Sequence, residues 1–157
     1  MHHAFVGNSF MSYLFNIIIM AIVPAFCEEL AFRGVVQHLC SKWTGKLHLG
    51  IVQSSLLFAT LHFQFYNFFA LLFVGLFFGY LVAYTGTIWI TIIIHFLYNL
   101  FSLTILFLSK KEIIDTNSKL EHIGFVHLFL LLASIGFVFY ILRKNNKLKD
   151  TEKMYLN

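Results

Sequence analysis

The chain has 157 residues, of which 59% are hydrophobic, 18% aromatic and only 11% charged. A soluble globular chain would carry about 25% charged residues, so the composition excludes that class. The net charge of +4 does not indicate nucleic acid as a partner, because the excess of positive charge lies after Tyr140. There it is typical of a segment at a membrane surface. We therefore expect an all-α, polytopic transmembrane helical bundle whose outer surface contacts lipid.

About five hydrophobic helices are expected, separated by short polar turns. No Asp, Glu, Lys or Arg lies between Lys46 and Lys110, and this run is long enough for about three spans of ~20 residues each. A long first helix precedes it, and Pro24 is expected to kink that helix. A last apolar helix follows a polar loop of mixed charge. The predicted helices cover residues 9–40, 48–63, 68–84, 88–108 and 122–142.

The sequence indicates a single membrane-embedded domain, residues 1–142, followed by a basic, disordered tail, residues 143–157. Counting Lys and Arg places the 41–47 turn and the tail on one side of the membrane, which the positive-inside rule assigns to the cytoplasm. Gly75 and Gly79 form a GxxxG pair inside an apolar helix, and this spacing allows a neighbouring backbone to approach closely. The motif is common and predicts packing only.

Three charged residues, Glu28, Glu29 and Arg33, interrupt the first apolar segment. A charge near the centre of a bilayer costs at least ~2.5–3.5 kcal/mol, so an ionisable side chain there indicates a functional site by default. Arg33 follows Glu29 by four residues and shares its helix face, so an ion pair is expected, which can be purely structural. Glu28 lies about 100° further round the helix and has no local cation. The spacing therefore predicts one supporting and one working carboxylate.

Two imidazoles and an amide are expected near Glu28. Glu28 lies 17 residues before Gly45, and His62 lies 17 residues after it. Antiparallel helices of equal rise place these two side chains at nearly the same depth. His95 lies inside the fourth predicted helix, and Asn99 follows it by one turn on the same face. The sequence therefore predicts a polar cluster within the membrane, contributed by three helices.

Such a cluster suits hydrolysis of an amide by an activated water. A carboxylate beside an imidazole can deprotonate a water, which then attacks a carbonyl. A second imidazole and an amide can donate to the resulting oxyanion. The side chains of Glu28, His62 and His95 also suit Zn²⁺ as ligands, and spacing alone does not separate the two chemistries. Polar residues that only hold helices together are a third interpretation.

Three motifs in the chain resemble those of the CPBP family, the CAAX prenyl endopeptidases and bacteriocin-processing proteins, also called the Abi family. Residues 28–33 read EExxxR, residues 58–62 read FxxxH, and residues 95–99 read HxxxN. Each motif alone is common. Their order and spacing within apolar helices is specific, and the resemblance covers roughly residues 20–105.

The resemblance implies an intramembrane, glutamate-dependent endopeptidase that uses neither a metal nor another cofactor. Glu28 would be the general base that activates water, with His62 beside it. His95 and Asn99 would form the oxyanion hole. The residues expected to support these four are Glu29, Arg33 and Phe58.

The resemblance also implies partners, a location and a biological role. The expected partners are membrane lipid and a membrane-associated peptide or protein substrate, and the expected location is a bacterial cell membrane. Prokaryotic members are associated with bacteriocin maturation, self-immunity or peptide signalling. Two alternatives are kept: a non-catalytic membrane protein that gives immunity by sequestering a peptide, and a zinc-dependent membrane metalloprotease. The chain is short for the family.

Overall fold

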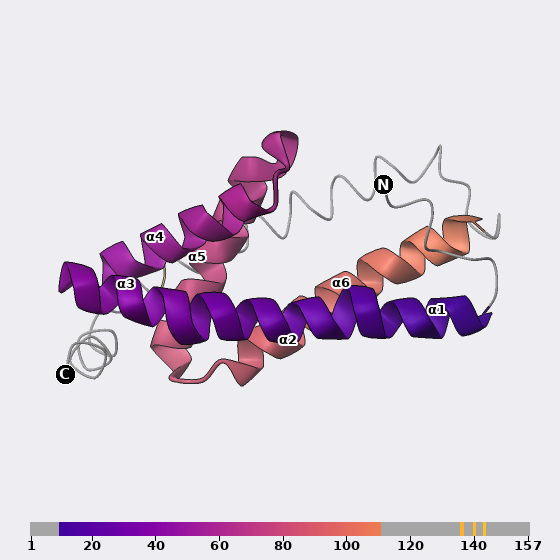
Figure 1. Cartoon of the computed structure of the whole chain (residues 1–157), viewed down its shortest axis with the longest axis horizontal. Helices are drawn as coiled ribbons and strands as arrows, with labels where there is room; N and C mark the ends of the chain where they lie inside the picture. The colour runs from indigo at the N-terminus through magenta and orange to yellow at the C-terminus, as the bar shows by residue number, and fades with distance from the viewer. Residues whose placement is uncertain (1–9, 111–135, 137–139, 141–142, 144–157) are drawn as a thin grey trace.

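The computed structural model describes residues 10–110 and the isolated positions 136, 140 and 143. The continuous part is all-α, as predicted, with helices joined by short turns (Figure 1). The fifth predicted helix, residues 122–142, and the basic tail lie outside the described residues, apart from those three positions.

The first apolar segment forms one helical rod from Phe10 to Thr44 (Figure 1). Two π-helical stretches interrupt its α-helical hydrogen bonding, and the first ends just before Pro24, which has no backbone N–H to donate. The expected irregularity at Pro24 is therefore a widened turn, and the helix continues through it. The parts of the rod are α1 (Phe10–Ile17), η1 (Ile18–Ile22), α2 (Val23–Glu29), η2 (Leu30–Val36) and α3 (Gln37–Thr44).

Three further helices follow, and their ends differ from the predicted ends by at most two residues. The rod and α5 stop at Gly45 and Gly86, which have φ angles of 65° and 74°. Glycine adopts this left-handed conformation without a Cβ clash, and it commonly ends helices in this way. The elements are α4 (Leu47–Leu61), η3 (Phe65–Asn67), α5 (Phe68–Thr85) and α6 (Trp89–Lys110).

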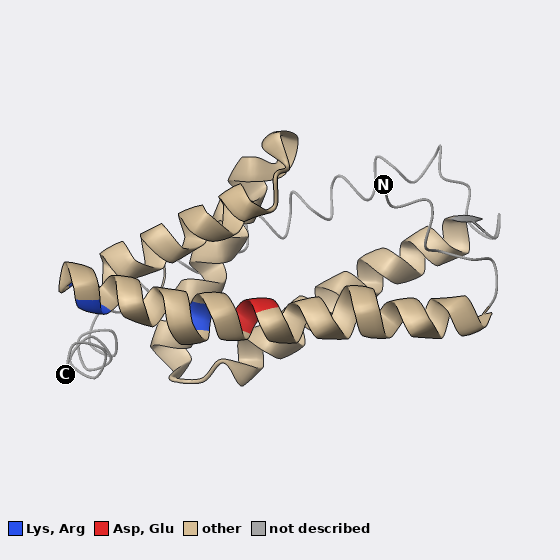
Figure 2. Cartoon of the chain, in the orientation of Figure 1, with Lys and Arg blue, Asp and Glu red and all other residues tan. Residues whose placement is uncertain are grey.

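The helices pack on different halves of the rod. The α4–α5 pair lies against the α3 half, and α6 lies against the α1–α2 half (Figure 1). The acidic pair and an arginine lie near the middle of the rod, between the two halves, and a lysine lies at its far end (Figure 2). Within the described residues, three helices are long and apolar enough to cross a membrane, namely Phe10–Thr44, Phe65–Thr85 and Trp89–Ser109.

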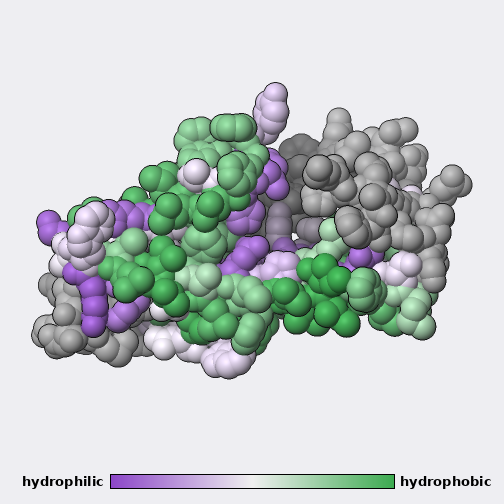
Figure 3. Space-filling model, in the orientation of Figure 1, coloured by the Kyte–Doolittle hydropathy of each residue, from purple (hydrophilic) through white to green (hydrophobic). Residues whose placement is uncertain are grey.

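Each half has its own apolar core. Between α4 and α5 the buried side chains are Leu47, Ile51, Tyr80 and Ala83. Between α1 and α6, Leu103 and Phe107 are buried against Tyr13, whose hydroxyl lies 2.8 Å from that of Thr104. Many large apolar side chains of the described helices are also exposed, as expected for contact with lipid, and Figure 3 shows them on one face of the molecule.

A row of polar side chains follows one face of the rod at four-residue spacing. We call Glu29, Arg33, Gln37 and Ser41 the polar row. All four are at most 2% exposed. Polar groups without partners are costly inside a protein. Glu29, Arg33 and Gln37 form hydrogen bonds to neighbouring helices and so position them along the rod, whereas Ser41 donates to the carbonyl of Gln37 within the rod.

Gly50 should be indispensable for packing of α4 on the rod. A Cβ at this position would lie 2.6 Å from the backbone N of Ser41 and 2.7 Å from its Cα. We expect Gly50→Ala to destabilise the protein by about 1–3 kcal/mol through overpacking. Circular dichroism during SDS-induced unfolding in mixed micelles measures the loss.

Gly34 provides the matched control, because a Cβ there meets nothing within 4 Å. Gly34→Ala should leave stability unchanged or raise it by roughly 0.5–1 kcal/mol, since alanine favours a helix over glycine. Equal stability of the two variants would contradict the close contact at Gly50.

Candidate active site

Glu29 lies at the centre of a buried set of contacts. Its Oε1 accepts a hydrogen bond from Nη1 of Arg33 at 3.1 Å and lies 3.0 Å from Nδ1 of His95. Arg33 also donates from Nη2 to the carbonyl oxygen of Gly75 at 3.3 Å. Glu29 is 0% and Arg33 2% exposed, so protein groups rather than water compensate their charges. The ion pair expected from the four-residue spacing is present, and it also holds one imidazole.

Two aromatic rings flank the guanidinium group. The Cζ atom of Arg33 lies 4.6 Å from the ring centre of Phe58 and 5.3 Å from that of Phe78. The ring centre of Phe58 lies 4.4 Å from that of His62, so Phe58 walls the cluster as expected. Phe78 lies 5.6 Å from the ring of His95. Together the rings separate the buried ion pair from its surroundings and add cation–π contacts.

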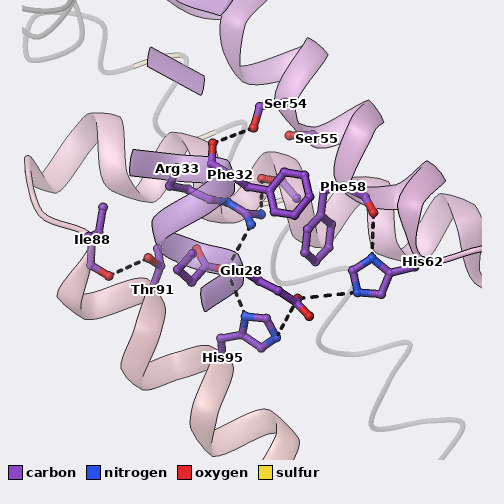
Figure 4. Close-up of polar contacts among 12 residues, drawn as sticks. Glu28, Phe32, Arg33, Ser54, Ser55, Phe58, His62, Ile88, Thr91 and His95 are labelled. Atoms are coloured by element: carbon purple, nitrogen blue, oxygen red, sulfur yellow. Dashed lines mark hydrogen bonds and ion pairs between the residues drawn. The ribbon is translucent and has the colours of Figure 1, made fainter. Parts of the chain in front are cut away.

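Glu28 lies beside the buried pair and faces both imidazoles. Its Oε2 lies 3.6 Å from Nε2 of His62 and 3.8 Å from Nε2 of His95, as Figure 4 shows. Both distances are longer than a hydrogen bond. Oε2 is itself buried and has no hydrogen-bond partner among the described residues. The structure therefore brings together the carboxylate and the two imidazoles that the sequence placed at one depth.

The other nitrogen of each imidazole is already engaged. Nδ1 of His62 lies 2.7 Å from the carbonyl oxygen of Phe58, and a carbonyl only accepts, so this nitrogen carries the proton. By the same reasoning Nδ1 of His95 donates to the carboxylate of Glu29. In a neutral ring the second nitrogen then holds a lone pair. With both rings neutral, three acceptors face one another at Glu28, an arrangement that a shared proton, a water or a cation can satisfy.

Local backbone features position these side chains. Glu28 and Glu29 end α2, immediately before the π-helical turn η2, and turns of this kind occur frequently at functional sites. His62 directly follows α4, and Phe63 then has a φ of 51°, which residues other than glycine seldom adopt. The chain therefore leaves α4 just beyond His62, whose ring points towards Glu28 (Figure 4).

The reactive groups differ in exposure. The side chains of Glu28 and His62 are 30% and 25% exposed, whereas Glu29 is fully buried. Figure 3 shows hydrophilic surface in a hollow between the apolar surfaces of α4–α5 and those of the N-terminal half of the rod. Glu28 and His62 are therefore accessible from outside the protein, whereas Glu29 is not.

Asn99 is the predicted site residue that the structure does not join to the others. It lies one turn beyond His95 in α6 and is partly exposed. Within residues 10–110, no hydrogen bond or ion pair connects its side chain to Glu28 or to either imidazole. Its role in an oxyanion hole stays a prediction.

Two contributors to the site were not predicted. The carbonyl oxygen of Gly75 accepts from Arg33, and the ring of Phe78 lies over both Arg33 and His95. Every residue has a backbone carbonyl, so the residue type does not show which carbonyl accepts a hydrogen bond from a distant side chain. The GxxxG spacing did mark the place where the backbone of α5 comes close enough to be used.

The zinc alternative requires donor atoms grouped around one point. In the part of the chain that the structure describes, no group of three or more His, Cys, Asp and Glu side chains is arranged to hold a metal ion. The geometry therefore adds no support to the zinc alternative.

Comparisons with known proteins agree with the three motifs. A family model described as type II CAAX prenyl endopeptidase Rce1-like matches residues 10–101, more than half of the chain. The uncharacterized protein YpbD of Bacillus subtilis (strain 168) is 30% identical over 86 residues, which cover 52% of this chain and 41% of that relative. The chain thus spans less than half of the length of this relative. No solved structure matches significantly. The chain belongs to the type II CAAX prenyl endopeptidase Rce1-like family, as its EExxxR, FxxxH and HxxxN motifs indicated.

Proposed function

We propose that the protein is an intramembrane, metal-independent, glutamate-dependent endopeptidase of a bacterial cell membrane. The observation that carries this proposal is the position of Glu28 Oε2, which is buried, lacks a hydrogen-bond partner and faces the Nε2 atoms of His62 and His95. Family membership supports the reaction class. The Bacillus subtilis relative supports a bacterial host.

Glu28 is the general base in this proposal. A water held between Glu28 and His62 gives a proton to the carboxylate as its oxygen attacks the scissile carbonyl carbon. The carbonyl becomes an oxyanion. When the C–N bond breaks, the proton on Glu28 passes to the departing nitrogen, so the products are a carboxylic acid and an amine. No covalent enzyme intermediate is needed.

His95 and Asn99 stabilise the oxyanion in this proposal. Because Nδ1 of His95 donates to Glu29, Nε2 can donate only when the ring is protonated on both nitrogens. A donor beside the oxyanion is worth more in a water-poor site than in bulk water. Asn99 would add its amide N–H when substrate is bound, since catalytic hydrogen bonds often tighten only in the complex.

The proposed substrate is a membrane-associated peptide or protein. The apolar outer surface of the helices supports access from lipid. Bacteriocin maturation, self-immunity and peptide signalling are the proposed settings, and they rest on the family resemblance alone.

Glu28→Gln and His62→Ala should each reduce cleavage at least about 10²-fold, because Glu28 takes the proton of the attacking water and His62 holds that water in place. Proteomic comparison of membranes from cells with the wild-type and Glu28→Gln proteins measures the effect as accumulation of an uncut precursor. Cys27→Ala is the matched control, since Cys27 is the exposed neighbour of Glu28 and forms no disulfide. The Cys27→Ala protein should cleave the precursor as the wild type does.

Cleavage that survives both changes in correctly inserted protein would contradict these roles. Activity that disappears on chelation and returns with Zn²⁺ would favour the metalloprotease. If the precursor is never cut, but Glu28→Gln cells remain protected from a bacteriocin, the protein sequesters its ligand instead.

Asn99→Ala should lower kcat by about 10²–10³-fold while KM changes little, because its amide would act only on the oxyanion. The purified precursor, once identified, allows both constants to be measured. Ser102→Ala serves as the control, since Ser102 is an exposed residue of the same helix. If kcat is unchanged in Asn99→Ala, the oxyanion hole must be built from His95 and other donors.

A further inference from the structure

Two parallel hydrogen bonds connect the polar row to α5. Arg33 donates from Nη2 to the carbonyl oxygen of Gly75 at 3.3 Å, and Gln37 donates from Nε2 to that of Gly79, also at 3.3 Å. Donors and acceptors are each four residues apart, so one turn of the rod is matched to one turn of α5. This pairing fixes how far α5 can slide along the rod.

Glycine at both acceptor positions makes the pairing possible. A Cβ at Gly75 would lie 3.0 Å from Cβ and 3.1 Å from Cα of Ser55. A Cβ at Gly79 would lie 2.7 Å from Cγ2 of Ile51 and 2.9 Å from Oε1 of Gln37. Larger residues would therefore push α5 away from α4 and away from the donors of the rod.

The first of these bonds leads directly to the candidate active site. The guanidinium of Arg33 joins the carbonyl of Gly75 to Oε1 of Glu29, which accepts in turn from Nδ1 of His95. A shift of α5 along the rod would therefore move one acceptor of Arg33. Through Arg33 and Glu29, it would disturb the contact of Glu29 with Nδ1 of His95.

Gln37 donates the second hydrogen bond, but its own side-chain oxygen has no donor within residues 10–110. It is 1% exposed, and its Oε1 is buried without a hydrogen-bond partner among the described residues. A buried acceptor that finds no donor destabilises a protein, and an apolar side chain of similar size would avoid that cost. We therefore attribute the role of Gln37 to its Nε2 donor, which binds α5 through the carbonyl oxygen of Gly79.

We propose that Gln37 is a positioning residue of the endopeptidase: by holding α5 in register with the rod, it keeps Arg33 and Glu29 aligned so that the ring of His95 stays hydrogen-bonded through Nδ1, with its Nε2 directed at Glu28. This role rests on the proposed function. Gln37 is too far along the rod to be part of the Glu28 cluster, because it lies two helical turns beyond Glu29.

Gln37→Leu tests the proposal, with Gln53→Leu as the matched control. Gln53 is a partly buried glutamine of α4 whose Oε1 also lacks a partner. Should Gln37→Leu fail to fold, Gln37→Met provides a more adaptable apolar side chain. Two experiments compare the variants. The first measures kcat and KM for the precursor that accumulates in Glu28→Gln membranes. The second measures the ¹⁵N chemical shifts of His95 in histidine-labelled protein in micelles at alkaline pH. The His95 signals are assigned by their loss in His95→Asn.

We expect Gln37→Leu to lower kcat roughly 10- to 100-fold with little change in KM, because small misplacements of catalytic groups have effects of this size. The ¹⁵N shifts of His95 should move towards a mixture of the two tautomers. Gln53→Leu should resemble the wild type in both measurements. Folded Gln37→Leu protein with wild-type kcat or unchanged His95 shifts would overturn the proposal, as would equal effects in Gln53→Leu.

A separate measurement, cleavage by the Glu28→Gln variant, shows whether the proposed function is wrong. If Glu28→Gln still cuts the precursor, the endopeptidase mechanism is wrong. The ¹⁵N shifts need no substrate, so they decide independently whether Gln37 determines the state of His95.

Discussion

The structure depends on one carboxylate oxygen, Oε1 of Glu29, which is shared by Arg33 and His95. Charges inside a membrane are expensive, and removing one partner of a buried pair typically costs 3–5 kcal/mol because the other charge is left uncompensated. The three groups therefore have to stay together. Since Arg33 also binds α5 through Gly75, the requirement to neutralise one acid joins the rod, α5 and α6 at a single point.

The two adjacent glutamates show how this arrangement leaves one acid free to react. They lie on different faces of the rod, so one is enclosed while the other borders the hollow. Oε1 of Glu29 is held by Arg33 and His95, while its Oε2 is buried without a hydrogen-bond partner among the described residues. Among the same residues, Oε2 of Glu28 also lacks a hydrogen bond, and it faces the Nε2 atoms of both imidazoles. The two acids therefore differ in their surroundings and in exposure, and the proposed mechanism uses Glu28, the more exposed of the two.

Much of this arrangement could be predicted from sequence, because it follows from helix geometry. The end of α5 was predicted to within one residue, whereas the rod continues to Thr44, four residues beyond the predicted end. Equal helical rise placed Glu28 and His62 at the same level, and the structure has them 3.6 Å apart. The ion pair followed from four-residue spacing. Other features depend on which backbone groups become neighbours, and no residue type encodes that. The carbonyls of Gly75 and Gly79 are of this kind, as are the π-helical turns and the contact of His62 with the carbonyl of Phe58.

The packing of α4 and α6 on different halves of the rod has a consequence for the alignment of the two imidazoles. These two helices carry or adjoin the rings, yet each is anchored by a separate apolar core and they have little contact with each other. The distance between the rings is therefore set through the rod, which contacts both helices. A bend near the middle of the rod would separate His62 from His95 without breaking either core.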